Sequence, residues 1–110
     1  MSDYVVAKRY AKALFEVAQE AGSVESTAEQ LRIVAELWEQ AKDFRSFMSH
    51  PGVPNASKME LVKQATGSDL SELVSHTLEL LIERGRFSIV PALYQTFVAI
   101  SDEQFGRAKA

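Results

Sequence analysis

Apolar side chains recur every three or four residues through almost the whole chain, and no stretch alternates apolar and polar residues over more than a few positions. The first spacing is that of an α-helix, whereas alternation would indicate a β-strand. The chain has 110 residues, of which 46% are apolar, and this is enough for one domain with one core. We therefore expect a single all-α domain.

Glycine and proline divide this pattern into six predicted helices. Gly22, Gly67 and Gly85 each follow an apolar periodic stretch, which is where helices commonly end. Pro51 and Pro54 enclose a loop, because a residue before proline avoids the helical conformation. The expected helices cover residues 4–21, 24–42, 44–48, 56–66, 70–84 and 89–105, as a six-helix bundle.

Polar residues stand at the expected start of each helix, where a side-chain oxygen can accept a hydrogen bond from a free backbone N–H. Asp69 followed by Glu72 resembles a capping box. Pro91 would lie in the first turn of the last helix, where its missing N–H costs little. The other expected caps are Ser2 or Asp3, Ser23, Asp43, Asn55 and Ser88.

Two of the predicted helices carry more apolar surface than one core contact requires. On a wheel at about 100° per residue, the polar side chains of helix 4–21 fill an arc of roughly 120° and leave more than about 180° apolar or small. Helix 70–84 has the same pattern. One side of the apolar arc carries Val6, Tyr10, Ala13, Val17 and Ala21 on the first helix, and Leu73, Thr77, Leu80 and Arg84 on the second. The other side carries Ala7, Ala11, Phe15 and Ala18 on the first helix, with Leu14 between the two sides, and Leu70, Val74, Leu78, Leu81 and Ile82 on the second. Either both helices are buried on two sides, or their edges form an exposed groove for an amphipathic partner helix.

The sequence offers no set of residues with catalytic or cofactor chemistry. It has no cysteine, no HExxH, and no two glycines close enough to cradle a phosphate. His50 and His76 lack ligand-spaced neighbours, and Asp69, His76 and a serine would form a triad without any motif context. We therefore expect no catalytic residue, no metal and no cofactor. The net charge of −3 argues against a general nucleic-acid binder, and no apolar run is long enough to span a membrane.

Two stretches are similar to a known family. Residues 6–18, VAKRYAKALFEVA, resemble the first helix of the ATP synthase delta subunit, whose pattern is A-x-x-Y-A-x-A-L-F-x-x-A. Residues 80–87, LLIERGRF, followed by residues 93–97, LYQTF, resemble the junction between the fifth and sixth helices of the same family. Pro51 and Lys58 also fall where the family tends to have them. The mitochondrial relative is the oligomycin-sensitivity-conferring protein.

The resemblance implies a non-catalytic stator domain of the peripheral stalk, which helps to couple proton transport to ATP synthesis by holding the catalytic head. Residues 1–105 would form an N-terminal domain that binds the N-terminal helix of an alpha subunit, and residues 106–110 would start a linker to an absent C-terminal domain that meets the b-subunit stalk. It further implies a monomeric domain that does not insert into the membrane. The expected location is the cytoplasmic side of a bacterial cell membrane, since no organelle-targeting peptide is visible.

In the family, the alpha-subunit helix lies between helices one and five. Carried onto this sequence, the resemblance implies partner contacts by Tyr10, Ala13, Leu14, Val17, Thr77, Leu80, Leu81 and Arg84. Leu14 and Leu81 can alternatively point into the core. Three other readings remain open: a self-associating adaptor of the death-domain type, an RNA-associated bundle of the antitermination-factor type, and an enzyme.

Overall fold

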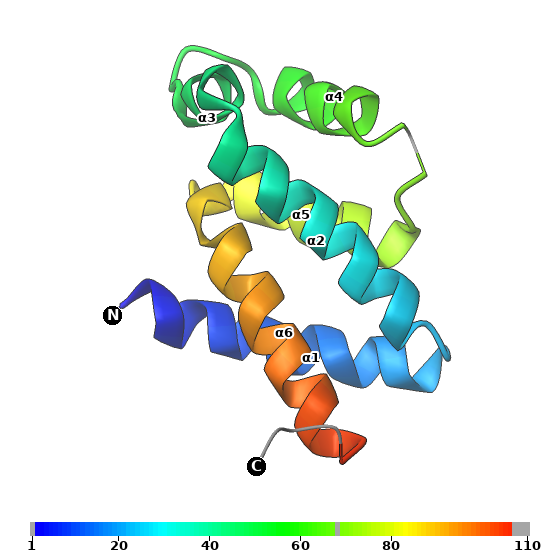
Figure 1. Cartoon of the computed structure of the whole chain (residues 1–110). Helices are drawn as coiled ribbons and strands as arrows, with labels where there is room; N and C mark the ends of the chain where they lie inside the picture. Colours follow the sequence, from blue (N-terminus) through cyan, green and yellow to red (C-terminus); the bar gives the residue numbers. More distant parts are fainter. Residues whose placement is uncertain (1, 68, 107–110) are drawn as a thin grey trace.

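The computed structural model describes residues 2–67 and 69–106, and within these ranges it contains six α-helices, one short 3-10 helix and no strand. The expected all-α fold is confirmed. In chain order the elements are α1 (Asp3–Glu20), α2 (Val24–Gln40), α3 (Lys42–Ser49), α4 (Asn55–Ala65), α5 (Glu72–Glu83), η1 (Phe87–Ile89) and α6 (Val90–Gln104) (Figure 1).

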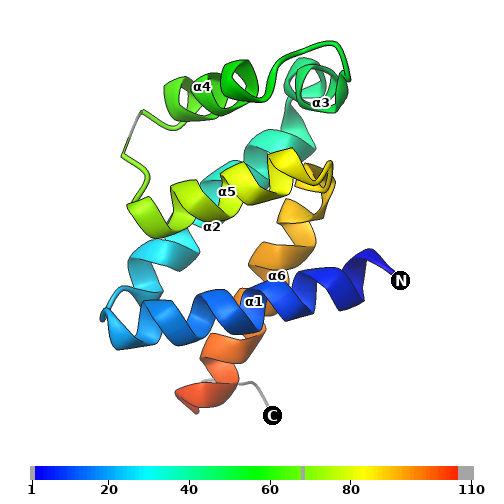
Figure 2. The same ribbon diagram turned by 180° about the vertical axis from the view of Figure 1, so that it is seen from behind.

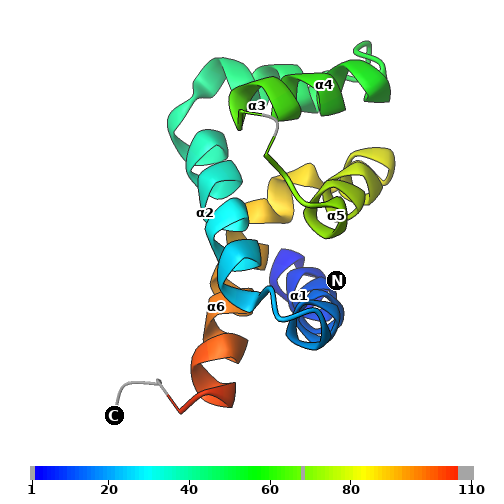
Figure 3. The same cartoon turned by 90° about the vertical axis from the view of Figure 1, so that its right-hand side faces the viewer.

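Helix α6 lies at the centre of the arrangement and packs against both α1 and α2 (Figure 1). Helix α3 contacts α2, and α4 contacts α5, so that α3 and α4 cover the end of the bundle furthest from α1 (Figure 3). Helix α5 lies beside α1 on the side of the molecule turned away from the viewer in Figure 1 and toward the viewer in Figure 2. No helix within the described ranges has the length and apolar character needed to cross a bilayer.

The contact between α1 and α6 forms one half of the core. Ala7, Ala11 and Ala18 of α1 are fully buried, and their small side chains allow the two helices to approach closely. Between them Phe15 meets Phe97 edge to face, with ring centroids 5.7 Å apart. Alternating small and large residues therefore fix how α6 crosses α1.

A second aromatic cluster joins α2, α3 and η1. The ring of Phe87 lies 5.8 Å from Trp38 and 6.0 Å from Phe44, measured between ring centroids. Phe87 and Ile89 are both buried, which anchors the short 3-10 helix that leads into α6. This cluster ties the turn after α5 to the rest of the core.

Gly85 lies in the turn that ends α5. Gly85 has a φ of 66°, a left-handed conformation that side chains with a Cβ rarely adopt. The N–H of Gly85 donates to the carbonyl of Ile82 at 3.1 Å, and the N–H of Arg86 donates to the carbonyl of Leu81 at 2.8 Å. These two bonds form a Schellman motif, which satisfies the last carbonyls of the helix. The predicted stop at Gly85 is confirmed.

Only some of the predicted helix caps are correct. Ser2 accepts a hydrogen bond from the N–H of Val5, as expected for the cap of α1. For α5 the prediction of Asp69 was wrong, because Ser71 is the cap and accepts from the N–H of Val74 at 3.1 Å. The N–H of Ser71 also donates to the side-chain oxygen of Gln30 on α2, at 2.9 Å. This tertiary contact fixes the start of α5 at a position that local sequence does not reveal.

Three further caps differ from the prediction. Asp43 lies inside the first turn of α3, whose cap is Ala41, and there its negative charge still favours the helix N-terminus. Asn55 is the first residue of α4 rather than its cap, because the extended conformation of Pro54 takes the capping position. The structure also places the cap of α6 at Ile89 rather than Ser88, since the 3-10 helix occupies residues 87–89.

The remaining boundaries are close to the prediction. Ser23 stands at the start of α2, but its hydroxyl donates to the carbonyl of Ala18 instead of capping α2. Helix α2 ends at Gln40, two residues before the predicted end, and Pro91 lies in the first turn of α6 as expected. Of the predicted linker at 106–110, only Gly106 falls within the described residues.

Candidate helix-binding groove

Helices α1 and α5 lie side by side and run in opposite directions (Figures 2 and 3). A side-chain hydrogen bond joins them: Nη1 of Arg84, at the end of α5, donates to the phenol oxygen of Tyr10 on α1, at 2.8 Å. The C-terminal end of α5 therefore meets the N-terminal half of α1. Tyr10 and Arg84 each belong to one of the two sides of the apolar arc described for their helix.

The predicted edge of α1 is exposed rather than buried. Val17 has 50% of its surface exposed, Ala13 is also exposed, and Tyr10 is half-buried against the core. The core of α1 is formed instead by Ala7, Ala11, Leu14, Phe15 and Ala18, with Val6 at its margin. Of the two interpretations that the sequence left open, the structure favours an exposed apolar edge on α1.

The facing edge of α5 is partly exposed and lacks free polar groups along its middle. Leu80 and Thr77 are half-buried, and Arg84 is exposed. The hydroxyl of Thr77 donates to the carbonyl of Leu73 at 2.9 Å, so its hydrogen bond is made within the helix. The side chains of Thr77 and Leu80 therefore offer mainly carbon atoms to a neighbour.

A hollow of about 510 Å³ lies at the end of this seam where Tyr10 meets Arg84. Its lining residues come from α1 and the C-terminal end of α5 with the turn that follows it: Val6, Arg9, Tyr10, Ala13, Arg84 and Arg86. The lining thus combines apolar side chains with three arginines. The Schellman motif at Gly85 places Arg84 and Arg86 on either side of the turn that closes this end.

Six of the eight residues implied by the family resemblance lie on these two edges, and two do not. Leu14 is 4% exposed and Leu81 is fully buried, so both belong to the core. A partner lying in the groove could not contact their side chains without opening the bundle. The structure joins Tyr10 to Arg84 and places Ala13 in the lining of the same hollow, whereas Val17, Thr77 and Leu80 lie outside that lining and are exposed or half-buried on their own helices.

The sequence analysis did not single out Arg9 or Arg86, which also line the hollow. The available clue was position, because Arg9 precedes Tyr10 and Arg86 follows the glycine that ends α5. Tyr4 and Val5, with 58% and 44% of their surfaces exposed, extend the apolar character of α1 toward its N-terminus.

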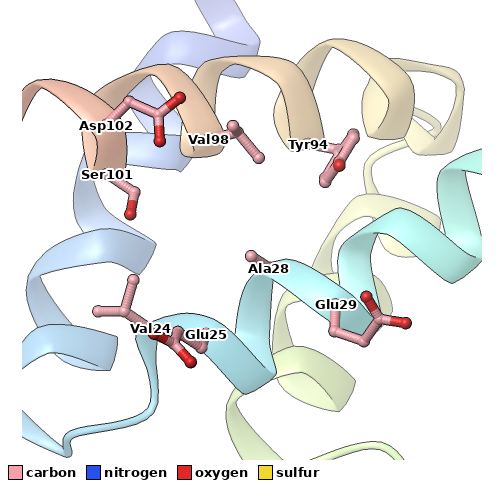
Figure 4. A pocket seen from close by; sticks show the side chains of 8 residues that line it. All are labelled: Val24, Glu25, Ala28, Glu29, Tyr94, Val98, Ser101 and Asp102. Carbon is pink, nitrogen blue, oxygen red and sulfur yellow. The ribbon is translucent and has the colours of Figure 1, made fainter. Parts of the chain in front are cut away.

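A second hollow, of about 230 Å³, lies between α2 and α6 (Figure 4). The side chains of Tyr94 and Val98 approach Ala28 across it, and carboxylates surround it. Glu29 on this rim is paired with Arg32, whose hydrogen bond holds the pKa of the Glu29 carboxyl below its ordinary value. Within the described residues, no group of three histidine, cysteine or acidic side chains is arranged to hold a metal ion.

The fold places the chain in a broad class, the small all-α domains, and leaves apolar side chains of α1 exposed. Comparison with known proteins defines the class more narrowly. The family described as ATP synthase delta (OSCP) subunit matches residues 6–110. The chain belongs to this family.

Three relatives illustrate the match. The chain is 39% identical over 110 residues to the ATP synthase subunit delta of Anoxybacillus flavithermus, covering 100% of this chain and 61% of that protein. It is 40% identical over 102 residues to the subunit of Bacillus subtilis, covering 93% and 56%, and 37% identical over 107 residues to that of a Geobacter species, covering 96% and 59%. The chain thus spans roughly three-fifths of the length of these relatives.

Proposed function

We propose that this chain is the part of a peripheral-stalk subunit that binds the N-terminal helix of an ATP synthase alpha subunit in the groove between α1 and α5. The observation that carries the proposal is the exposed apolar edge of α1, which a hydrogen bond from Arg84 to Tyr10 joins to the end of α5. Membership of the delta (OSCP) family supports the choice of partner.

The groove would obtain most of its affinity from apolar burial. Each Å² of apolar surface removed from water contributes roughly 25 cal/mol before the entropy cost of association is subtracted. Tyr10 is the natural anchor, because an aromatic ring buries a large area and loses few rotamers on binding. Val17 and Leu80 would add area on either wall of the groove.

The proposed role is mechanical rather than catalytic. In it, the domain holds the catalytic head against the torque of rotation and so helps to couple proton transport to ATP synthesis. A further domain of the full-length subunit would meet the b-subunit stalk. The complex would be peripheral to a bacterial cell membrane, on its cytoplasmic side.

Calorimetric titration of this chain with a synthetic alpha-subunit N-terminal peptide from the same organism tests the proposal. We expect saturable 1:1 binding with a negative heat-capacity change. Leu80→Asp should weaken binding at least tenfold, about 1.4 kcal/mol, because it places a charge on the apolar wall. The matched control is Gln95→Asp, which adds the same charge at an exposed position of α6 outside the groove.

The outcomes separate the alternatives. Equal affinity of the wild type and a folded Leu80→Asp variant would refute the groove assignment. If the folded wild type did not bind the peptide and self-associated with rising concentration, the adaptor reading would replace the stator reading. RNA binding that falls steeply with salt would instead favour the RNA-associated bundle.

A further inference from the structure

The hollow at the end of the groove is basic, although the chain as a whole has a net charge of −3. Arg9, Arg84 and Arg86 line it together with the apolar side chains of Val6 and Ala13. Hydrophobic burial explains the apolar residues but not the guanidinium groups of Arg84 and Arg86. Their presence in one place requires a separate account.

Arg84 and Arg86 are both exposed at the C-terminal end of α5. Within residues 2–67 and 69–106, no carboxylate forms an ion pair with either side chain. Arg32 on α2 shows the contrasting case, because Glu29 and Glu36 bind it from both sides. The basic end of the groove is therefore complementary to an acidic group from outside the chain.

The donors at this end converge. The phenol oxygen of Tyr10 accepts a hydrogen bond from Arg84, so its own O–H remains able to donate. Arg84 uses Nη1 in this bond and keeps further N–H groups. A carboxylate in the hollow could accept from the phenol and from a guanidinium at once, and hydrogen bonds with a charged partner are stronger than neutral ones.

We propose that Tyr10, Arg84 and Arg86 bind a side-chain carboxylate of the partner helix and thereby fix its register in the groove; this inference rests on the proposed function. An apolar stripe repeats every three or four residues, so a partner shifted by one turn would keep similar apolar contacts. The same shift moves a carboxylate by about 5.4 Å along the helix axis and out of reach of the donors. The basic end distinguishes registers that the apolar walls do not.

A double-mutant cycle tests this inference. The alpha-subunit N-terminal peptide is titrated into wild type and into Arg84→Gln, and each aspartate or glutamate of the peptide is replaced in turn by asparagine or glutamine. For one peptide position, we expect neutralisation to weaken binding to the wild type about fivefold and to have almost no effect on Arg84→Gln. At every other acidic position of the peptide, neutralisation should change the affinity for the two proteins by the same factor.

The controls separate charge from structure. Lys8→Gln removes the same charge from α1 at a position about 160° around the helix from Tyr10, and it should leave affinity unchanged. Tyr10→Phe keeps the ring but removes the hydroxyl, and it should weaken the coupling at the same peptide position. Arg86→Gln provides a second test if Arg84→Gln lowers the thermal stability measured by circular dichroism.

Failure of this inference is distinguishable from failure of the proposed function. If the peptide binds and Leu80→Asp weakens it, but no acidic position couples to Arg84 or Arg86, the groove stands and the carboxylate contact is refuted. Absence of binding by the folded wild type would overturn both. Coupling at two positions one helical turn apart would show two bound registers and would contradict the proposed selection.

Discussion

Leu80 and Leu81 are neighbours in α5 whose side chains have different surroundings. Truncation to alanine should therefore mainly lower the free energy of unfolding at Leu81 and mainly lower the affinity for the partner peptide at Leu80. Leu81 is fully buried, and a leucine-to-alanine change at such a site costs about 2–5 kcal/mol. Because a domain of this kind is stable by only about 5–15 kcal/mol, that loss is large. Leu80 is half-buried at the edge of the groove, and its truncation should cost under about 1 kcal/mol.

Binding should show the reverse order. The methyl and methylene groups of Leu80 would be buried by the partner, and each buried CH₂ contributes about 0.8 kcal/mol. Leu80→Ala should therefore lose roughly 1–2 kcal/mol of binding, a factor of about 5–30. Leu81→Ala should bind the peptide almost as the wild type does wherever it remains folded, since its side chain lies behind the surface.

Urea unfolding followed by circular dichroism measures the first effect, and calorimetric titration with the alpha-subunit peptide measures the second. Both variants remove the same atoms from adjacent residues of one helix, so differences in helix propensity cancel. Equal losses of stability would refute the placement of Leu81 in the core and Leu80 at its edge. Weaker peptide binding by folded Leu81→Ala than by Leu80→Ala would refute the groove geometry.

Three further changes test the fold. Gly85→Ala should cost about 1–2 kcal/mol, because the left-handed conformation disfavours a Cβ although no atom lies within 4 Å of it; urea unfolding equal to wild type would contradict this. Ala11→Leu should lower stability by about 1–3 kcal/mol by overpacking the close contact of α1 with α6, and an unchanged thermal midpoint would argue against that contact. The hydrogen bond from Arg32 lowers the pKa of the Glu29 carboxyl. The pair therefore adds a small stabilisation of the folded state at pH values above the usual pKa of 4.5, and this stabilisation is lost as the pH falls through the lowered pKa. The stability difference between wild type and Arg32→Gln should accordingly shrink in acid, and a difference that grew there would contradict the pairing.

The helices were predictable because their signals are local. Periodic apolar residues and the glycines at 22 and 85 specify where most helices run and end. The surplus apolar arc of α1 was also visible, since a wheel shows which residues share an edge. What the wheel cannot show is which edge the core takes, and this is why Leu14 and Leu81 were open until the packing was known.

Features that depend on contacts between distant residues were not predictable. Ser71 caps α5 because Gln30, 41 positions earlier in the chain, holds its backbone N–H. The basic hollow depends on the antiparallel approach of α1 and α5, which brings Tyr10 to Arg84 across 74 positions. In the sequence these arginines are scattered, and only the fold makes them neighbours.

The composition of α1 is better explained if a further helix covers its open apolar edge. Its alanines at 7, 11 and 18 pack closely on α6, and its other apolar edge runs past α5 with Val17 half exposed. A polar arc of only roughly 120° is narrow for a helix at the margin of a small domain. It fits a helix that a further helix covers along the open edge. A bound amphipathic helix with a carboxylate at this end would account both for the open edge and for Arg84 and Arg86, which form no ion pair within residues 2–67 and 69–106.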